Sequence, residues 1–544
     1  MKEYELRTIR RVRMAPSAWH NPTTEYSLTS RALKAAAIAA IAALALTACT
    51  KDPLTDPTAT GNTSTQAPAP SGDLKPVEGF ETYYSQEVKW EDCGGNFQCA
   101  TVQAPMNWAD PASDAIDIAI KKLPSSGSAP KGTVIINPGG PGGSGIEFVD
   151  YAPFMFGATL IENYNILGFD PRGVGQSTPV KCYESEQMDH YLAQSFDPEH
   201  PKALEAARQA TADYGKACLE NTGAVLEFID TQSSARDMDL LRALMGDEKI
   251  NYLGFSYGTQ LGATYAGIFP ENVGNMVLDG AIDLRLTAFE QSMQQAVGFE
   301  NALRAFAENC VEYGDCPVAG DTDQVMAAVA ELFDRLGKSP LPTDDPERVL
   351  TQSLAFYGVA QPLYAEVLWP ALGEGLELAI NQRDGSVLLE LSDDYFGRSD
   401  DGTYMNNQTE AFTAINCLDD RSSADLDTMK KEAEEIRKAA PVMGEFFTYG
   451  GISCENWPFP VAGQNFDLAA SGAAPIMVIG TTNDPATPYV WAEGLAEQLE
   501  SGFLVTNVGE GHTAYGMGNQ CILDVVDNFF VNGTVPSSDP NCGG

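Results

Sequence analysis

Residues 249–262 read Lys-Ile-Asn-Tyr-Leu-Gly-Phe-Ser-Tyr-Gly-Thr-Gln-Leu-Gly. An apolar, strand-like run leads into Gly-x-Ser-x-Gly, and a helical segment follows that ends before Pro270. A serine at such a strand-to-helix turn sits on strained backbone, and side chains two residues before or after it would clash. The helix also directs the positive end of its dipole at the serine. The pattern predicts that Ser256 is a nucleophile; a glycine-rich turn without chemistry is the alternative.

Strand-like and helical segments alternate on both sides of this stretch. Helical segments such as Ser234–Met245 separate the strands, and this alternation is typical of an α/β fold with a mostly parallel central sheet and helices on both faces. The predicted strands, which are short β-branched or apolar runs bounded by Gly, Pro or Asp, are Thr133–Asn137, Tyr164–Phe169, Ile250–Phe255, Asn275–Leu278, Pro475–Gly480 and Phe503–Asn507.

Residues 284–460 interrupt the alternation. This stretch has no clear strand pattern and contains the predicted helices Phe289–Asn309, Thr322–Leu336 and Leu426–Ala440. We therefore expect a mainly helical inserted cap domain at 284–460, between a first core part at 79–283 and a C-terminal core part at 461–544.

An acid and a base follow Ser256 in the chain. Downstream of Ser256, His512 is the one histidine, and Asp484 stands at the end of a predicted strand. A serine nucleophile in this kind of fold is followed in sequence by an acid and then a histidine, the acid holding the imidazole in one tautomer. We predict His512 as the general base and Asp484 as its partner; the alternative for Asp484 is a helix cap.

The strand Thr133–Asn137 runs into a glycine-rich loop at residues 138–145 (PGGPGGSG). Acyl transfer requires two N–H donors for the tetrahedral oxyanion, one after the nucleophile and one from a loop after an earlier strand. We expect Tyr257 to supply the first and Gly140 the second. A phosphate-binding loop is the rival interpretation, but the sequence has neither G-K-[ST] nor G-x-G-x-x-G here.

The N-terminal region has the features of an export signal. Arg31 and Lys34 precede an apolar run from Ala35 to Ala48, too short to span a bilayer, and Leu-Thr-Ala-Cys at 46–49 resembles a bacterial lipobox. We expect a lipoprotein signal peptide at 1–48, with Met14 as an alternative start, and lipid on Cys49. Residues 49–78 are rich in Thr, Pro and Ser and should form a flexible linker.

Removing Cys49 leaves ten of the eleven cysteines. An even number in an exported chain indicates five disulfides, and although many connectivities are possible, the spacing suggests 93–99, 182–218, 310–316, 417–454 and 521–542. No C-x-x-C occurs, and besides His512 the mature chain has only His190 and His200, so we expect no metal and no cofactor.

Several motifs resemble the tripeptidyl aminopeptidase and prolyl iminopeptidase branch of the α/β-hydrolases. They are 139–143 (GGPGG), 169–177 (FDPRGVGQS) and 254–258 (GFSYG), in matching order from about residue 85 to the C-terminus; 90–93 (WEDC) and 454–458 (CENWP) are similar to the secreted tripeptidyl type. Pro138 stands where prolyl iminopeptidases usually carry His, which favours the tripeptidyl type. The resemblance implies the α/β-hydrolase fold, a structural Arg172, and an extracytoplasmic exopeptidase that removes short peptides from free N-termini.

Such an exopeptidase needs a carboxylate for the substrate ammonium, because a desolvated cation without a partner is costly. Glu300 and Asp419 in the expected cap are the candidates, although each could be a surface or structural acid. A carboxylesterase or lipase with the same triad is the alternative, and a non-catalytic peptide-binding lipoprotein is a third.

The formal net charge of −42 indicates an acidic surface that repels nucleic acid. We expect peptide substrates with a free N-terminus, membrane contact through the lipid anchor only, no nucleic-acid partner and a monomer.

Overall fold

The computed structural model describes residues 77–543 apart from 198–199, 315 and 420–421. The predicted leader, Cys49 and all but the last two residues of the predicted linker lie outside this range. Within the described ranges, the structure has no helix with both the length and the apolar character needed to cross a membrane.

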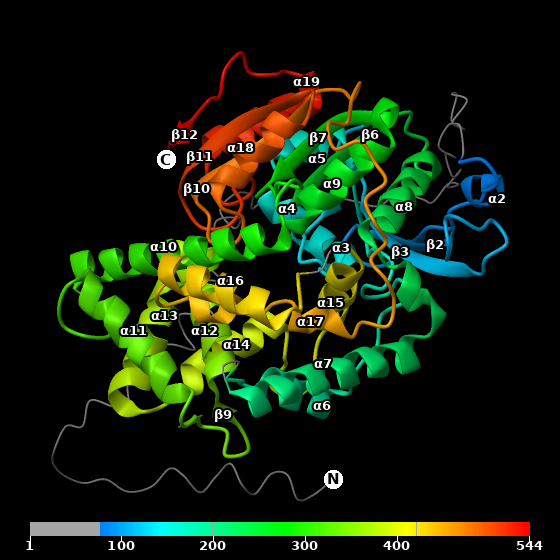
Figure 1. The fold of residues 1–544 in the computed structure, drawn as a ribbon. Helices are drawn as coiled ribbons and strands as arrows, with labels where there is room; N and C mark the ends of the chain where they lie inside the picture. Colours follow the sequence, from blue (N-terminus) through cyan, green and yellow to red (C-terminus); the bar gives the residue numbers. More distant parts are fainter. Residues whose placement is uncertain (1–76, 198–199, 315, 420–421, 544) are drawn as a thin grey trace, which may run out of the picture. The chain divides into compact units, whose positions relative to one another are not determined.

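Ten strands form one sheet in the order β1-β2-β3-β5-β4-β6-β7-β10-β11-β12 (Figure 1). The six predicted strands lie in its centre and run parallel to one another. They are β4 (Thr133–Asn137), β5 (Asn165–Phe169), β6 (Ile250–Phe255), β7 (Val273–Asp279), β10 (Ile476–Asn483) and β11 (Gly502–Glu510). The predicted α/β-hydrolase fold, with its mostly parallel sheet, is confirmed.

The sequence analysis missed four strands at the two edges of the sheet. They are β1 (Glu91–Asp92), β2 (Gln98–Pro105), β3 (Ala115–Leu123) and β12 (Cys542–Gly543). The first three pair antiparallel, and β3 joins them to β5. Strands at an antiparallel edge keep one face in water, so they lack the continuous apolar run that marks the buried central strands.

Helices cover both faces of the sheet, because successive strand residues point to opposite sides. In β4, Ile135 packs in the cluster that contains α8 (Thr231–Leu244), α9 (Tyr257–Ile268) and α18 (Tyr489–Gln498). Val134 and Ile136 pack in the opposite cluster, with α5 (Ala158–Asn163) and α19 (Gln520–Asn532). All five positions of β4 are therefore buried, and its three central residues are apolar.

The chain between β7 and β10 builds a separate helical core, in which α10 to α14 pack together (Figure 1). Its two short strands, β8 (Leu341–Pro342) and β9 (Val349–Leu350), pair with each other outside the large sheet. We call residues 288–455 the inserted region. Its helices are α10 (Ala288–Tyr313), α11 (Thr322–Leu336), α12 (Gln352–Ala360), α13 (Trp369–Glu377), α14 (Ser386–Phe396), α15 (Gln408–Asp419), α16 (Leu426–Ala439) and α17 (Ile452–Glu455), and the three predicted ones match within a few residues.

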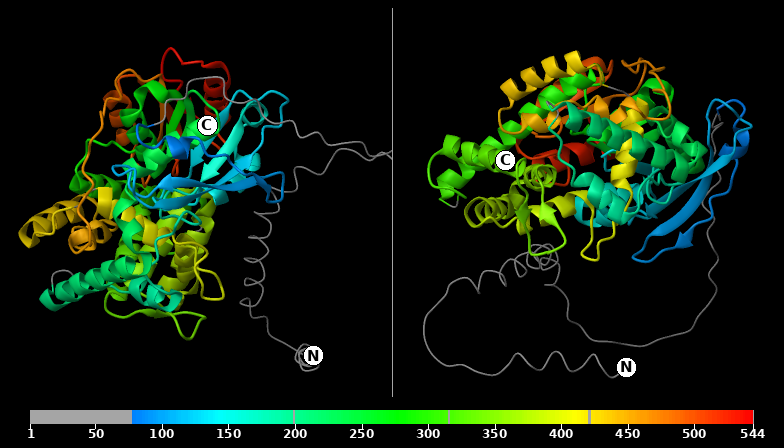
Figure 2. Two further views of the ribbon diagram at one scale, coloured as in Figure 1. Left: turned by 90° about the vertical axis from the view of Figure 1, so that its right-hand side faces the viewer. Right: turned by 60° about the horizontal axis from the view of Figure 1, so that its bottom comes forward.

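Two helices that precede the nucleophile in sequence also lie with the inserted region. They are α6 (Ser185–Leu192) and α7 (Pro201–Thr222), and Figure 1 and the left panel of Figure 2 both place them beside its helices. Leu204 and Ala207 of α7 pack against Met429 and Ala433 of α16. The helical layer beside the sheet therefore comes from two separate stretches of the chain.

All five predicted disulfides are present. They are Cys93–Cys99, Cys182–Cys218, Cys310–Cys316, Cys417–Cys454 and Cys521–Cys542. Cys417 lies in α15 and Cys454 in α17, so this bond fixes α15 within the inserted region.

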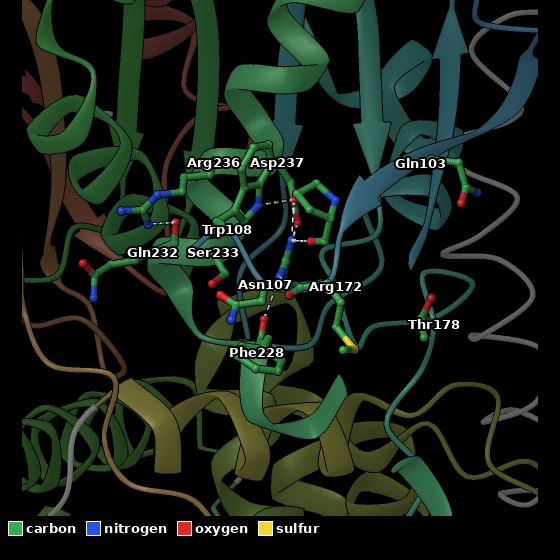
Figure 3. Close-up of polar contacts among 12 residues, drawn as sticks. Gln103, Asn107, Trp108, Arg172, Thr178, Phe228, Gln232, Ser233, Arg236 and Asp237 are labelled. Atoms are coloured by element: carbon green, nitrogen blue, oxygen red, sulfur yellow. Dashed lines mark hydrogen bonds and ion pairs between the residues drawn. The ribbon is translucent and has the colours of Figure 1, made fainter. Parts of the chain in front are cut away.

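A buried ion pair joins the antiparallel edge to the rest of the core (Figure 3). Arg172, fully buried in the loop after β5, donates from Nε and Nη2 to the two carboxylate oxygens of Asp237 in α8, each at 2.7 Å. Trp108 Nε1 donates to the same carboxylate at 3.0 Å. The other three guanidinium N–H groups donate to the main-chain oxygens of Pro105, Met106 and Phe228. All five donors of Arg172 are satisfied, which is a structural role.

We expect Asp237→Ala to lower the free energy of unfolding by about 3–5 kcal/mol, because it leaves the buried Arg172 charge without its counter-ion. Asp150→Ala is the matched control, since Asp150 pairs with Lys121 at 2.6 Å but is half exposed, and such pairs contribute about 0–1 kcal/mol. Denaturant unfolding of both variants measures the difference. Similar losses for the two would contradict a structural role for the Arg172–Asp237 pair.

Candidate active site

The predicted nucleophile lies on a strained turn between β6 and α9. Ser256 has φ 53° and ψ −122°, in the region that residues with a side chain rarely adopt. A Cβ at Gly254 would lie 2.4 Å from the main-chain oxygen of Gly258, and one at Gly258 would lie 2.9 Å from that of Asn137. The flanking glycines are therefore required by close backbone approach, as the pentapeptide predicts.

The glycine-rich loop after β4 lies directly beside this turn. A Cβ at Gly139 would come within 2.9 Å of the Ser256 Cβ. The next residue, Gly140, lines the same cavity as Ser256 and Tyr257. The structure thus brings the two predicted oxyanion-hole residues together around Ser256.

The predicted acid and base form a hydrogen-bonded pair. His512 Nδ1 lies 2.9 Å from each carboxylate oxygen of Asp484, which is almost fully buried. Asp484 follows β10 and His512 follows β11. The main-chain N–H groups of Ala486, Thr487 and Thr513 also donate to Asp484 and fix its orientation. With Nδ1 engaged by Asp484, the other ring nitrogen is left as the proton acceptor.

Asp279, at the end of β7, connects the serine turn to the histidine loop. Its main-chain oxygen accepts from Ser256 N–H at 2.8 Å. Its buried carboxylate accepts from Ala514 N–H at 3.0 Å and from Tyr515 N–H at 2.7 Å. Asp279 also stands at the end of a strand, but it contacts main chain rather than the imidazole, so the geometry favours Asp484 as the acid.

Charge around His512 favours its protonated form. Burial lowers the pKa of His512, but the charge and hydrogen bond of Asp484, together with the charge of Asp279, outweigh burial and raise the pKa above its ordinary value. Burial raises the pKa of Asp279 to about 7, although the N–H groups of Tyr515 and Ala514 oppose this shift. The imidazolium that forms when a serine is deprotonated is therefore stabilised mainly by Asp484, and by Asp279 where that group is ionised.

Ser256 opens into a cavity of about 820 Å³. Residues of the core and of the inserted region line it together, and Asp419 is among them. A cavity of this volume is in the range that encloses a small ligand. Among the described residues, no group of three or more His, Cys, Asp or Glu side chains is arranged to hold a metal ion.

The two predicted ammonium-binding acids lie in different surroundings. Asp419, the last residue of α15, is half-buried in the cavity wall and accepts from Thr231 N–H at 2.8 Å and from the Thr231 hydroxyl. Glu300 is buried in α10 and accepts from the N–H groups of Val442 and Met443, at 3.0 and 2.9 Å. Glu300 is not among the residues that line the cavity, and its carboxylate joins α10 to the segment after α16.

The inserted region supplies contacts that the sequence analysis did not predict. The main-chain oxygen of Tyr364 accepts from His512 N–H at 2.9 Å, and the Tyr364 ring packs edge-on against the imidazole at 5.2 Å between centroids. Tyr364 belongs to the short helix η5 (Gln361–Tyr364). No sequence signal marks it, because the contact is long-range. For Asp279 a signal existed: it ends a predicted strand, as Asp484 does.

The site combines a strained serine between a strand and a helix with a histidine–aspartate pair that follows later strands of the same parallel sheet. This arrangement defines a serine hydrolase of the α/β-hydrolase fold. Residues 440–542 match the family model described as TAP-like protein. Serine protease Hip1 of Mycobacterium tuberculosis is 34% identical over 487 residues, 85% of this chain and 92% of that protein. The chain therefore belongs to the family of α/β-hydrolases that includes Hip1.

Two further relatives are named for an esterase and for an aminopeptidase. Carboxylesterase B of Mycobacterium tuberculosis is 36% identical over 455 residues, 82% of this chain and 86% of that protein. Tripeptidyl aminopeptidase of Streptomyces lividans is 28% identical over 473 residues, 84% of this chain and 86% of that protein. The crystal structure of a proline iminopeptidase from Mycobacterium smegmatis covers 79% of this chain and 97% of its own, but its TM-score of 0.35 at 14% identity adds nothing to the assignment.

We expect Asp279→Asn to lower kcat/KM on the order of 10²-fold, because it weakens the contacts that position the His512 loop. It should also shift the acidic limb of the kcat/KM–pH profile to lower pH. Asp279 has a pKa of about 7, so it is ionised only in the upper part of the acidic limb. There its charge raises the pKa of His512, and removing that charge lowers this pKa, so the imidazole stays neutral in slightly more acidic solution.

Asp247→Asn is the control for this profile. Asp247 is a half-buried carboxylate that accepts from Thr133 N–H, at the end of β4 that lies away from the glycine-rich loop. Its substitution should leave the acidic limb in place. An unchanged limb in Asp279→Asn, or an equal shift in both variants, would exclude an influence of Asp279 on His512.

Proposed function

We propose that the protein is an extracytoplasmic serine exopeptidase that removes short peptides, of tripeptide length, from free N-termini. The observation that carries the proposal is that Asp419 and Ser256 line the same cavity. The names of two relatives, serine protease Hip1 and tripeptidyl aminopeptidase, support peptide substrates.

In the proposed reaction Ser256 Oγ attacks the carbonyl carbon of the scissile peptide bond while His512 takes the hydroxyl proton. The N–H groups of Gly140 and Tyr257 stabilise the oxyanion. His512 then gives its proton to the leaving amine, the C–N bond breaks, and an acyl-enzyme remains on Ser256. Water, deprotonated by His512, hydrolyses the ester and releases the short peptide. Asp484 holds the imidazole in one tautomer throughout.

Asp419 is the proposed partner of the substrate's α-ammonium. It is connected to the residue after the nucleophile, because Thr231 Oγ1 donates to Asp419 and also bonds the Tyr257 hydroxyl. Asp419 also accepts from the side-chain amide of Gln260, one turn into α9, at 3.4 Å, so it lies beside the helix that begins at the nucleophile.

Glu300 is less suited to this role. Its carboxylate accepts two main-chain N–H groups inside the inserted region, and it does not line the cavity. We assign Glu300 to the structure of the inserted region and Asp419 to the substrate.

A carboxylesterase or lipase with the same triad remains the second candidate. The observation in its favour is that aromatic side chains line part of the cavity. The relative named Carboxylesterase B is consistent with it.

The remaining proposals concern organisation and location. We propose that residues 284–460 form a cap domain between the core parts 79–283 and 461–544, since the inserted region has its own apolar core. We also propose a signal peptide at 1–48, a linker at 49–78, a lipid anchor on Cys49 as the sole membrane contact, and a monomer that binds no nucleic acid. The five disulfides support an oxidising compartment.

The anchor proposal predicts that Cys49 is the first residue of the mature protein and carries lipid. Mass spectrometry of protein extracted from membranes measures this directly. In Cys49→Ser the protein should leave the membrane fraction. Membrane-bound Cys49→Ser protein of unchanged mobility would rule out the anchor.

N-acetylation of a tripeptidyl substrate should lower kcat/KM roughly 10- to 150-fold, because it removes a charge-assisted hydrogen bond to Asp419. The same loss should appear as pH rises through the amine pKa of about 8. In Asp419→Asn the free and acetylated substrates should be cleaved at similar rates, whereas Glu300→Gln should keep the difference.

Ser256→Ala, which should lose roughly 10⁴-fold in kcat, provides the background rate. Equal turnover of free and acetylated substrates by the unmodified protein would refute the exopeptidase. Turnover of acyl esters without turnover of peptides would favour the esterase.

A further inference from the structure

Aromatic rings from four helices of the inserted region line one part of the cavity. Phe299 comes from α10, Phe356 and Tyr357 from α12, Tyr364 from η5, and Phe446 and Phe447 from η8 (Gly444–Phe447). Phe299 and Phe356 are mostly buried, and the other four are half-buried. The rings therefore present apolar surface to the cavity while their outer parts pack in the helical core.

These rings form a continuous series of contacts that begins at the histidine. Tyr364 packs edge-on against His512, and Phe299 lies 5.9 Å from Tyr364 between ring centroids. Phe447 follows at 5.7 Å from Phe299 and 5.6 Å from Phe356. Phe356 in turn stacks on Phe446 at 4.4 Å. We call this series of six rings the aromatic wall; its Tyr364 end lies beside His512.

The two tyrosines of the wall carry no charge at neutral pH. Burial, helped by the charge of Asp484, raises the pKa of the Tyr364 phenol. Burial raises that of Tyr357 as well. Both phenols remain uncharged at neutral pH, so the wall offers no charge to an ionic side chain. A Lys, Glu or Asp side chain placed there would lose hydration without gaining an ion pair.

The position of His512 decides which side of the scissile bond the wall adjoins. Asp419 lies on the side of Thr231 and Tyr257, where the proposed function places the substrate's N-terminus. His512 gives its proton to the departing amine, so the leaving residue lies next to the imidazole. The aromatic wall begins at the imidazole and leads away into the inserted region.

We propose that this wall is a subsite for a large apolar side chain on the residue just after the cleaved bond. The proposal rests on the proposed exopeptidase function and specifies its substrates: peptides in which the fourth residue from the free N-terminus is aromatic or a large aliphatic. Burial of that side chain against the rings stabilises both the complex and the transition state, as the hydrophobic effect requires.

The test uses the full protein and peptides that share Ala-Ala-Ala at the first three positions and carry Phe, Leu, Ala, Lys or Asp at the fourth. Release of Ala-Ala-Ala is followed by mass spectrometry. We expect kcat/KM for Phe and Leu to exceed that for Lys and Asp by roughly 10- to 200-fold, the range that apolar pockets achieve. Equal values would overturn the subsite. A second peptide set varies the third residue. If kcat/KM depends on the third residue and not on the fourth, the proposed position of the subsite on the leaving side is overturned.

Phe447→Ala should lower kcat/KM for the peptide with Phe at the fourth position more than for the all-Ala peptide, and so remove most of the preference for Phe; Phe447→Leu should restore the preference in part. Phe154→Ala is the matched control, because Phe154 is 74% exposed and is not among the cavity residues. Loss of the preference in Phe154→Ala, or its full retention in a folded Phe447→Ala protein, would contradict the proposal.

Failure of the exopeptidase proposal can be distinguished from failure of the subsite proposal. If the protein cleaves no peptide but hydrolyses esters, the exopeptidase is excluded, and the subsite is tested with benzyl and methyl esters of one acyl group. The subsite predicts faster hydrolysis of the benzyl ester, and loss of that difference in Phe447→Ala. Equal rates for the two esters would overturn it.

Discussion

The candidate site depends on Asp279, which holds two distant parts of the chain in register. Its main-chain oxygen accepts from Ser256 N–H, and its carboxylate accepts from Ala514 and Tyr515, just after His512. These contacts join the end of β7 to the loops that follow β6 and β11. A serine and a histidine so far apart in sequence can act as a unit only if such contacts fix their separation, since misplacement by about 1 Å already costs on the order of 10²-fold in rate.

The inserted region contributes to the same loops. Tyr364 accepts from His512 N–H, and the start of α15 lies directly on the glycine-rich loop, where a Cβ at Gly142 would come within 2.6 Å of the Gln408 oxygen. Asn407 receives Gly175 N–H and donates to the oxygens of Gly173 and Val180, so α15 is also bonded to the loop after β5. The inserted region and the loops around the site are therefore joined by direct contacts.

The sequence was most informative where local chemistry fixes local structure. The turn around Ser256, the central strands and the cysteine pairs each obey short-range rules, so their positions could be predicted within a few residues. The pairing of His512 with Asp484 follows from chain order in this fold. The antiparallel strands β2 and β3 were missed because their buried and exposed residues alternate in place of forming a continuous apolar run, the feature by which the central strands were recognised. Glu300 and Asp419 could not be told apart, since their difference is set by tertiary contacts.

The five disulfides each join a cysteine to the next cysteine along the described chain, with separations of 6 to 37 residues. When a chain emerges from a ribosome or an export channel in N- to C-terminal order, each cysteine pair is complete before the next pair appears. Non-native pairs then have little opportunity to form, and the chain needs little reshuffling of its bonds. This order of pairing suits a large protein that must mature where thiols are oxidised as soon as they are exposed.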